Sequence, residues 1–250
     1  MATRVALVTG SGKKRIGAVV AEALARRGYS LAVHYFHSAA EAAETAASLK
    51  EFGNEVATFQ ADLADDAAAR GMIDAVLARW TRIDVLVNCA AIWESIPLEE
   101  VTAADLRRNF DINALGTFLC CQQAGLAMVK QAEGGLIVNL GDWADARPYL
   151  GYAAYFASKG AVTSLTRSLA VELGVRNPNV RVNCIVPGPV MMPPTLTAQE
   201  KEEAIAATLV KREGSPQHVA QAVLSFLDND YITGVCLPVD GGRTVYAGGR

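Results

Sequence analysis

The sequence lacks the cysteine and histidine patterns that would indicate a disulfide framework or a zinc site. Its 250 residues include five cysteines and only three histidines, and no CxxC occurs. The cysteines stand at positions 89, 120, 121, 184 and 236. An odd count with one adjacent pair favours buried, reduced thiols. We therefore expect no metal site and a reducing, cytoplasmic location.

A strong charge imbalance and a long apolar run are also missing. Lys and Arg number 23 against 26 Asp and Glu, which gives a net charge of −3. This balance offers no electrostatic basis for binding nucleic acid or an anionic membrane. The N-terminus does not have the pattern of a signal peptide. No segment approaches the roughly 18 uninterrupted apolar residues of a membrane span. We expect neither a nucleic-acid partner nor a membrane.

Short β-branched runs that alternate with longer alanine-rich segments dominate the sequence. Hydrophobic residues make up 51% of the chain, enough for a substantial core. Strands are predicted at 5–9, 30–35, 56–60, 85–88, 136–140, 180–185 and 235–239. Helices are predicted at 16–27, 39–52, 64–79, 103–130, 152–175, 199–211 and 216–227. Continuous apolar strands separated by helices indicate parallel strands that are covered on both faces.

This alternation predicts a single α/β domain over residues 1–250, with a doubly wound parallel sheet of about seven strands and helices on both faces. One late segment interrupts the pattern with prolines at 187, 189, 193 and 194. Such a segment is predicted to be neither helix nor central strand. We expect a substrate loop over about residues 187–212.

The first strand is followed by a glycine turn that runs from Gly10 to Gly17 and leads into a helix. In such a turn, backbone N–H groups and the helix N-terminus can approach a pyrophosphate. The glycine spacing fits neither GxGxxG nor a P-loop. A purely structural turn therefore remains the alternative interpretation.

The end of the second strand favours NADP(H) as the cofactor. Enzymes that prefer the non-phosphorylated dinucleotide usually place an acid there to hold the ribose hydroxyls. The run from Tyr35 through His37 and Ser38 contains none before Glu41. These side chains and the basic Arg15 could receive a 2′-phosphate, which a carboxylate would repel. The alternative is a solvated basic turn.

Two later strand ends complete the predicted cofactor site. Asp62, followed by Leu63, could accept from an adenine amino group, although a helix cap is the favoured interpretation. The fourth strand ends in Asn88-Cys89-Ala90-Ala91. We expect these small residues to let a cofactor lie close to the backbone.

Tyr155 and Lys159 are separated by one helical turn, so both lie on the same face of the predicted helix. A nearby ammonium favours the phenolate and lowers the pKa of tyrosine from its usual value near 10. Tyr155 is therefore a candidate general acid or base. The YxxxK spacing is weak evidence when it stands alone.

The ordered set of motifs resembles the short-chain dehydrogenase/reductase family over essentially the whole chain. The set comprises the Gly10 turn, Asn88-x-Ala90, Asn113, Tyr155 with Lys159, Pro187-Gly188 and a closing Val-Asp-Gly-Gly at 239–242. The resemblance implies a Rossmann-type fold, hydride transfer from a nicotinamide and a homotetramer. With the strand ends above, it predicts a cofactor site made of Gly10, Arg15, Ile16, Tyr35, His37, Ser38, Asp62, Leu63, Asn88, Ala90, Tyr155, Lys159, Pro187 and Gly188.

The same resemblance implies three catalytic roles. Asn113 would hold a water in a proton relay, Tyr155 would donate the proton, and Lys159 would bind the ribose and tune Tyr155. Some positions depart from the usual family pattern: the first loop is one residue longer, His37 replaces a common arginine, and Met192 replaces a common threonine.

The most informative departure is Asp142, thirteen residues before Tyr155, where most family members have serine. An ionised carboxylate has no proton to donate to a ketone oxygen. It could instead pair with an amidine-like substrate edge or relay protons to a ring nitrogen. The alternative is a helix-capping Asp with lost or altered catalysis.

Asp142 makes the chain similar to the pteridine reductase and dihydromonapterin reductase branch, which carries Asp-Tyr-Lys. Arg15, the His-Tyr-x-x-Ser-Ala run at 34–39 and Trp93 also match this branch. There the aromatic residue stacks on a pterin and the arginine reaches both substrate and phosphate. Trp93 could equally be a core or interface aromatic.

The leading hypothesis is an NADPH-dependent reductase of a C=N bond in a pteridine or dihydropteridine. Its predicted substrate contacts are Arg15, Trp93, Asp142 and Tyr155. One alternative is a carbonyl reductase for a 3-oxoacyl thioester or another ketone. A non-catalytic cofactor-binding sensor is the other, and the presence of Asn113, Tyr155 and Lys159 argues against it.

Overall fold

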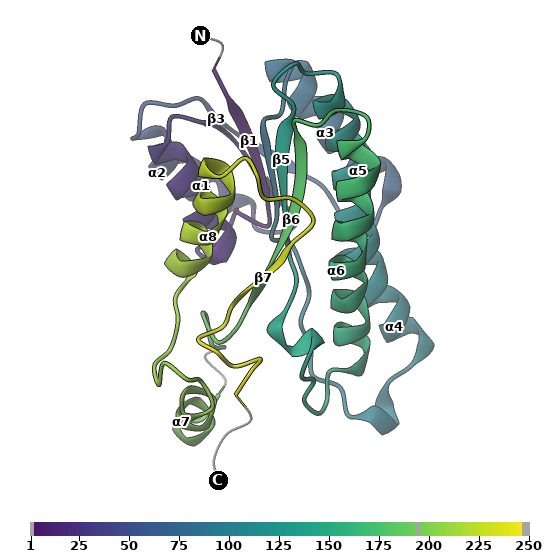
Figure 1. The fold of residues 1–250 in the computed structure, drawn as a ribbon, viewed down its shortest axis with the longest axis vertical. Coiled ribbons are helices and arrows are strands. Elements are labelled where there is room, and N and C mark those ends of the chain that lie inside the picture. Colours follow the sequence, from purple (N-terminus) through teal and green to yellow (C-terminus); the bar gives the residue numbers. More distant parts are fainter. Residues whose placement is uncertain (1–2, 194–195, 247–250) are drawn as a thin grey trace.

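A parallel sheet between two layers of helices forms the centre of the computed structural model, which describes residues 3–193 and 196–246 (Figure 1). The strands are β1 (Val5–Thr9), β2 (Ser30–Tyr35), β3 (Val56–Gln60), β4 (Val85–Asn88), β5 (Gly135–Leu140), β6 (Val180–Pro187) and β7 (Cys236–Val239). Their order in space is β3-β2-β1-β4-β5-β6-β7, and each neighbouring pair is parallel. The predicted doubly wound α/β sheet is confirmed.

Helices alternate with the strands, and most of them cover the two faces of the sheet. They are α1 (Ile16–Arg26), α2 (Ala39–Lys50), α3 (Asp66–Trp80), α4 (Ala103–Asn109), α5 (Gly116–Val129), α6 (Ala153–Gly174), α7 (Ala198–Ala206) and α8 (Pro216–Asp228). Helices α1, α2 and α8 lie on one face, and α3, α4, α5 and α6 lie on the other (Figure 1). All residues of β1, β4 and β6 are buried, as expected for strands covered on both sides.

The topological switch lies between β1 and β4. The chain leaves β1 toward β2 on one side and leaves β4 toward β5 on the other, which opens a crevice at the carboxyl ends of these strands. Thr9 pairs with Asn88, and Asn88 pairs with Asn139, so the three strands end at nearly the same level. The loops that follow them therefore meet at one edge of the sheet.

The predicted helix at 103–130 is one continuous helical stretch with a π-helical turn, Phe110–Leu115, between α4 and α5. Within that turn, the carbonyl of Asn113 accepts a hydrogen bond from the hydroxyl of Thr117. The stretch Ala103–Val129 has the length and composition of a membrane-crossing helix, but 56% of its apolar window is buried inside the fold. A core helix passes the same test, so this is weak evidence for a membrane span.

The predicted helix at 199–211 is shorter than expected, because α7 ends at Ala206. Beyond it, the backbone N–H groups of Leu209 and Val210 donate to the carbonyl of Gly241 rather than to a helical turn. Lys211 has φ 53°, in the left-handed region, which ends any helical continuation. The turn at Gly241 therefore accepts the hydrogen bonds that Leu209 and Val210 would donate within a longer helix.

Pro187 was predicted to lie in a loop, and this prediction is wrong: it is the last residue of β6. The ladder to β5 already ends where Leu140 meets Ile185, whereas Pro187 pairs with Val239 of the edge strand β7. No β5 carbonyl therefore requires the N–H that proline lacks. The prediction for Pro194 falls outside the described residues.

Candidate active site

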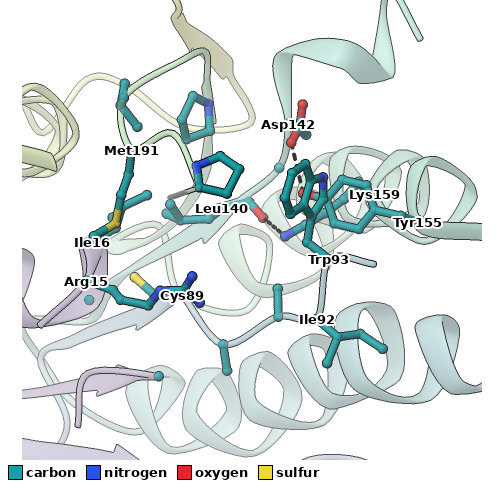
Figure 2. A pocket seen from close by; sticks show the side chains of 18 of the residues that line it. Arg15, Ile16, Cys89, Ile92, Trp93, Leu140, Asp142, Tyr155, Lys159 and Met191 are labelled. Carbon is teal, nitrogen blue, oxygen red and sulfur yellow. Dashed lines mark hydrogen bonds between the residues drawn. The ribbon is translucent and has the colours of Figure 1, made fainter. Parts of the chain in front are cut away.

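A cavity of about 820 Å³ opens at the carboxyl ends of the central strands. Most of the predicted site residues lie on its wall, and Figure 2 shows several of them converging on it. These are Gly10, Arg15, Ile16, Tyr35, Ser38, Asp62, Leu63, Ala90, Trp93, Asp142, Tyr155, Lys159, Pro187 and Gly188. Three predicted residues, His37, Asn88 and Asn113, are not among the described wall residues.

The glycine turn after β1 brings the backbone to the cavity. Gly10 has φ 64°, and a Cβ there would lie 2.9 Å from the backbone of Ala90. A Cβ on Gly17 would lie 2.7 Å from the carbonyl oxygen of Gly10. The turn therefore requires glycine at both positions. Arg15, at the N-cap of α1, makes no side-chain capping bond, which leaves the first N–H groups of the helix free for an anion.

His34 fixes this turn from β2 and was missed as a site residue. Its Nδ1 accepts from the Gly10 N–H at 2.9 Å, and its Nε2 lies 3.1 Å from the carbonyl oxygen of Ala61. The first bond requires an unprotonated Nδ1, so Nε2 carries the proton and donates to Ala61. Burial lowers the pKa of His34, which keeps the ring neutral.

The basic loop and the end of β2 form one end of the cavity. Lys13, Arg15, Tyr35 and Ser38 all line it. His37 is exposed, and its ring packs on the cavity residue Phe36 with centroids 3.6 Å apart. No carboxylate from β2 lies on this part of the wall.

Asp62 does not cap the next helix, so that interpretation is wrong. The N-cap of α3 is Asp65, whose side chain accepts from the Ala68 N–H. Asp62 instead lines the cavity and accepts from the Ala64 N–H at 3.0 Å through Oδ1. Oδ1 of Asp62 thus fixes the local turn, and the residue also lines the cavity.

Asn88 is a structural residue of the sheet, which corrects its prediction as a cofactor contact. Its side-chain amide donates to Asn139 Oδ1 at 2.9 Å and to Cys121 Sγ at 3.2 Å, and it is buried. Asn139 in turn donates to the hydroxyl of Thr166 on α6. This network points toward α6, away from the cavity, whereas Ala90 does line the cavity.

Asp142 and Tyr155 are in direct contact. The Tyr155 hydroxyl donates to Asp142 Oδ2 at 2.8 Å (Figure 2). Asp142 Oδ1 accepts from the Ala144 N–H at 2.9 Å. Asp142 is thus also the N-cap of a short 3₁₀ turn, Trp143–Asp145. The capping role and the contact with the phenol coexist, because each oxygen serves one of them.

Burial sets the protonation of this pair. It raises the pKa of Asp142, although the bonds from Ala144 and Tyr155 and the charge of Lys159 oppose the shift. The pKa of Tyr155 is raised well above 10, first by burial and then by the charge of Asp142 and the hydrogen bond to it. The prediction that Lys159 lowers the pKa of Tyr155 is therefore wrong here. Tyr155 remains a phenol with a proton to donate.

Lys159 lies one turn below Tyr155 on α6, as predicted, and is 4% exposed. Its Nζ donates to the carbonyl of Leu140 at 2.7 Å and lies 5.9 Å from the centroid of the Tyr155 ring (Figure 2). Burial lowers the pKa of Lys159, and Asp142 opposes this shift. The end of β5 therefore holds the buried cation, and the charge of Asp142 favours its protonated form.

Asn113 occupies the π-helical turn and is fully buried. Its Oδ1 accepts from the Ile92 N–H, and its amide donates to the Ile92 carbonyl and to the Ser158 hydroxyl. The side chain therefore joins the loop after β4 to α6. This contact positions the segment that carries Trp93.

Around the predicted Trp93, the cavity wall carries three aromatic side chains that sequence reasoning did not assign to the site, Trp143, Tyr149 and Tyr152. Trp93 stacks on Tyr152, with ring centroids 4.8 Å apart and planes at 15°. Tyr149 packs edge-on against Tyr152 at 5.1 Å, and its pKa is raised to about 12 by burial and the Asp142 charge. The dense aromatic run at 143–156 was the available signal.

The turn after β7 contributes a residue to the cavity wall. Arg243 lines the wall, donates to the carbonyl of Ala204 on α7, and has its guanidinium carbon 4.7 Å from the centroid of the Trp143 ring. Met191 and Met192, from the predicted substrate loop, also line it. No motif in the sequence pointed to Arg243.

The pattern of the protein family described as Enoyl-(Acyl carrier protein) reductase matches residues 10–244. An uncharacterized oxidoreductase of Methylorubrum extorquens is 36% identical over 96% of this chain and 97% of its own. Pteridine reductase 1 of Leishmania tarentolae is 34% identical over 96% of each chain. Further relatives have names that refer to steroid, diol and ketoacyl chemistry.

Solved structures also resemble this chain over nearly its whole length. The crystal structure of a blue fluorescent protein from a metagenomic library, in complex with NADPH, has a TM-score of 0.88 and 33% identity, covering 97% of this chain and 98% of that one. Both the sequence match and the structural likeness thus extend over nearly the whole chain. The chain belongs to the short-chain dehydrogenase/reductase family of NAD(P)-dependent oxidoreductases.

Proposed function

We propose that this protein is an NADPH-dependent reductase that transfers a hydride to a C=N bond of a pteridine or dihydropteridine. The observation that carries the proposal is the 2.8 Å hydrogen bond between Tyr155 and the Asp142 carboxylate. It puts an acceptor of N–H groups beside a proton donor on the cavity wall. A pteridine edge, with its amino group and ring nitrogens, offers partners for both. The 34% identity to a pteridine reductase supports the same assignment.

The cavity fits NADP(H) in its shape and charge. The uncapped N-terminus of α1 and the glycine turn suit a pyrophosphate, because their backbone lines the cavity. Lys13, Arg15 and Ser38 suit a 2′-phosphate at the end of β2. Asp62 is available to the adenine amino group. When bound, the reduced nicotinamide supplies the hydride.

The chain's own residues manage the proton. Tyr155 keeps its proton in the neutral range, so it can donate to a substrate nitrogen as the hydride arrives at carbon. For this step the substrate nitrogen must replace Asp142 Oδ2 as the acceptor of the Tyr155 hydroxyl. Asp142 then holds an N–H of the substrate edge, and Lys159 holds the ribose. Its buried cation also offsets the phenolate that forms.

Trp93 and Arg15 complete the proposed substrate site. The face of Trp93 that does not pack on Tyr152 would receive the flat ring, which would lie between it and the nicotinamide. Arg15, exposed on the opposite wall, would reach both substrate and phosphate. Asn113 would position the loop of Trp93, and its remaining acceptor capacity would hold the relay water.

We also propose a homotetramer and a single domain over residues 1–250 with its substrate loop at about 187–212. Support for assembly comes from apolar side chains on the outer faces of α5 and α6. Leu126, Val171 and Val175 are 44%, 66% and 84% exposed. Adjacent helices with such side chains suit a symmetric helix-to-helix interface.

A ketone reductase is the second candidate, because burial raises the pKa of Asp142. A protonated Asp142 could donate to a ketone oxygen, as a serine hydroxyl would. A 35% identical relative whose name refers to a ketoacyl reductase supports a ketone substrate.

An NADPH-oxidation assay with dihydrobiopterin against acetoacetyl thioester separates the two candidates. We expect dihydrobiopterin to be the better substrate by kcat/KM. Faster turnover of the thioester, with a rate that rises as the pH falls and Asp142 becomes protonated, would favour the ketone reductase instead.

A further inference from the structure

Two cysteines that are far apart in the sequence face each other across the edge of the sheet. Cys184 of β6 is the register partner of Cys236 of β7. They end a row of paired residues that crosses the sheet through Asn88 and Asn139. Side chains of register partners in a parallel pair project to the same face, which here is the face covered by α6.

Contacts with α6 confirm that the two thiols share this face. Cys184 is completely buried and packs with Val162 and Val186, and the half-buried Cys236 packs on the same cluster. Cys236 Sγ lies 3.9 Å from the carbonyl oxygen of Thr163. Neighbouring strands lie about 4.8 Å apart, within the roughly 4.4–6.8 Å between Cα atoms that a disulfide spans.

Cys236 is the more reactive of the two thiols. The pKa of Cys236 is lowered to about 7 by the neighbouring Cys184 thiol, with a contribution from the charge of Arg167. Burial raises the pKa of Cys89 and Cys120 to about 12 and suppresses their thiolates. A thiolate that is half-exposed and populated at neutral pH is the form that reacts with oxidants.

We propose that Cys184 and Cys236 form an oxidisable dithiol that hydrogen peroxide converts into an intramolecular disulfide. The Cys236 thiolate attacks one peroxide oxygen, the O–O bond breaks, and the second oxygen leaves as hydroxide and takes up a proton to become water. The Cys184 sulfur then attacks the resulting sulfenic sulfur and displaces its oxygen as a second water. Two thiols and one peroxide thus give one disulfide and two waters.

The position of this dithiol connects it to the active site. A Cβ on Gly141 would lie 3.1 Å from Cys184 Sγ, so this sulfur packs directly under the backbone that leads into Asp142. Strand β7 continues into the turn around Gly241 and then to Arg243 on the cavity wall. A disulfide would tie this edge strand covalently to β6.

The test counts thiols in the full-length protein after treatment with hydrogen peroxide and denaturation. We expect the titre to fall from the five cysteines of the sequence to three, with a mass loss of two hydrogens. Peptide mapping without reductant should find Cys184 linked to Cys236, and dithiothreitol should restore all five thiols. An unchanged titre, or a gain of oxygen mass without a link, would overturn the proposal.

Two variants make the assignment specific. Cys236→Ser and Cys184→Ser each have four cysteines, and neither should form a disulfide under the same treatment. Cys236→Ser changes a half-buried residue of an edge strand, so it is the safer variant for folding, which circular dichroism can verify. A link between the adjacent Cys120 and Cys121, or a disulfide that persists in Cys236→Ser, would contradict the proposal.

Discussion

The Tyr155 hydroxyl donates a 2.8 Å hydrogen bond to Asp142 Oδ2, so the phenol is in direct contact with a carboxylate. The other Asp142 oxygen accepts from the Ala144 backbone, which fixes the orientation of the carboxylate. This contact links the pKa values of the two groups, because the charge of Asp142 favours the protonated phenol. The chemistry of the site therefore depends on the pair rather than on either residue alone.

Replacing Asp142 by Ala should abolish pteridine reduction while NADPH still binds. The carboxylate is proposed to hold the substrate edge, whereas the cofactor is proposed to contact other walls of the cavity. We expect kcat/KM for dihydrobiopterin to fall by about 10²–10⁴, measured by NADPH oxidation. Fluorescence titration should give a similar Kd for NADPH.

Asp142→Ser is the matched control for this change. It restores a hydroxyl at the position and should shift the preference toward ketone substrates. If Asp142→Ala keeps its pteridine turnover, the assignment of this carboxylate is wrong.

Asp142→Asn should change the pH dependence of reduction. Reduction needs the phenol form of Tyr155, whose pKa is raised well above 10 partly by Asp142. In the wild type, ionisation of Tyr155 should not limit the rate up to about pH 10. Asn removes the negative charge, so the pKa of Tyr155 falls and the rate should decline at lower pH than in the wild type. A basic limb of the kcat profile that stays in place would contradict the coupling.

Arg15→Ala should weaken NADPH binding by about tenfold and leave NADH binding nearly unchanged, because one charge-assisted contact to the 2′-phosphate is lost. Isothermal titration with both dinucleotides measures the effect. His37→Ala provides the control, since its exposed ring packs on Phe36 and is not part of the cavity wall that the structure describes. A larger effect at His37 than at Arg15 would reverse the assignment of the phosphate site.

His34→Ala should lower the free energy of unfolding by about 1–3 kcal/mol, because the Gly10 N–H and the Ala61 carbonyl lose their buried partner. Urea denaturation at pH 7 measures this loss. His34→Gln, which offers both an acceptor and a donor, should recover part of it.

The contribution of His34 should also depend on pH. Its folded-state pKa lies below the ordinary value of 6.5, so the unfolded chain binds the proton more readily. The stabilisation is complete above pH 6.5 and is lost as the pH falls toward the folded-state pKa. Denaturation series between pH 7 and pH 5 should show a shallower loss of stability in His34→Gln than in the wild type.

Trp93→Ala should raise KM for a pteridine by about tenfold, because a stacking surface worth roughly 1 kcal/mol or more is lost. The Kd for NADPH should change little. Trp93→Phe keeps an aromatic face and should retain most of the affinity. An equal effect of both variants would indicate that Trp93 supports Tyr152 rather than the substrate.

The elements of the fold were largely predictable from local patterns. Strands β1 to β4 have the predicted bounds, because short apolar runs between turn residues decide where a buried strand begins and ends. Helix α7 was predicted too long, since the bonds that Leu209 and Val210 make with Gly241 come from a distant turn. Pro187 was misplaced for the same kind of reason: only the neighbouring strands show which side of β6 is free there.

The sequence predicted most residues of the cavity wall, but not all of them. Asp142, Tyr155 and Lys159 meet as their spacing suggested, because Asp142 follows β5 and the other two share one face of α6. Asn88 and His37 were assigned to the cofactor from their place in the chain alone. Whether a residue at a strand end faces the cavity or the core depends on the pleat and on the helix packed there.

The sequence by itself determined the α/β architecture, the glycine turn after β1 and the spacing of Asp142, Tyr155 and Lys159, because periodicity and short-range spacing are local properties of the chain. Tertiary structure alone decided that Tyr155 donates a hydrogen bond to Asp142, that Arg243 lines the cavity, and that Cys184 pairs with Cys236. These contacts join distant segments, and sheet register and helix packing bring them together. The same burial sets the pKa of Tyr155, against the expectation from Lys159 alone.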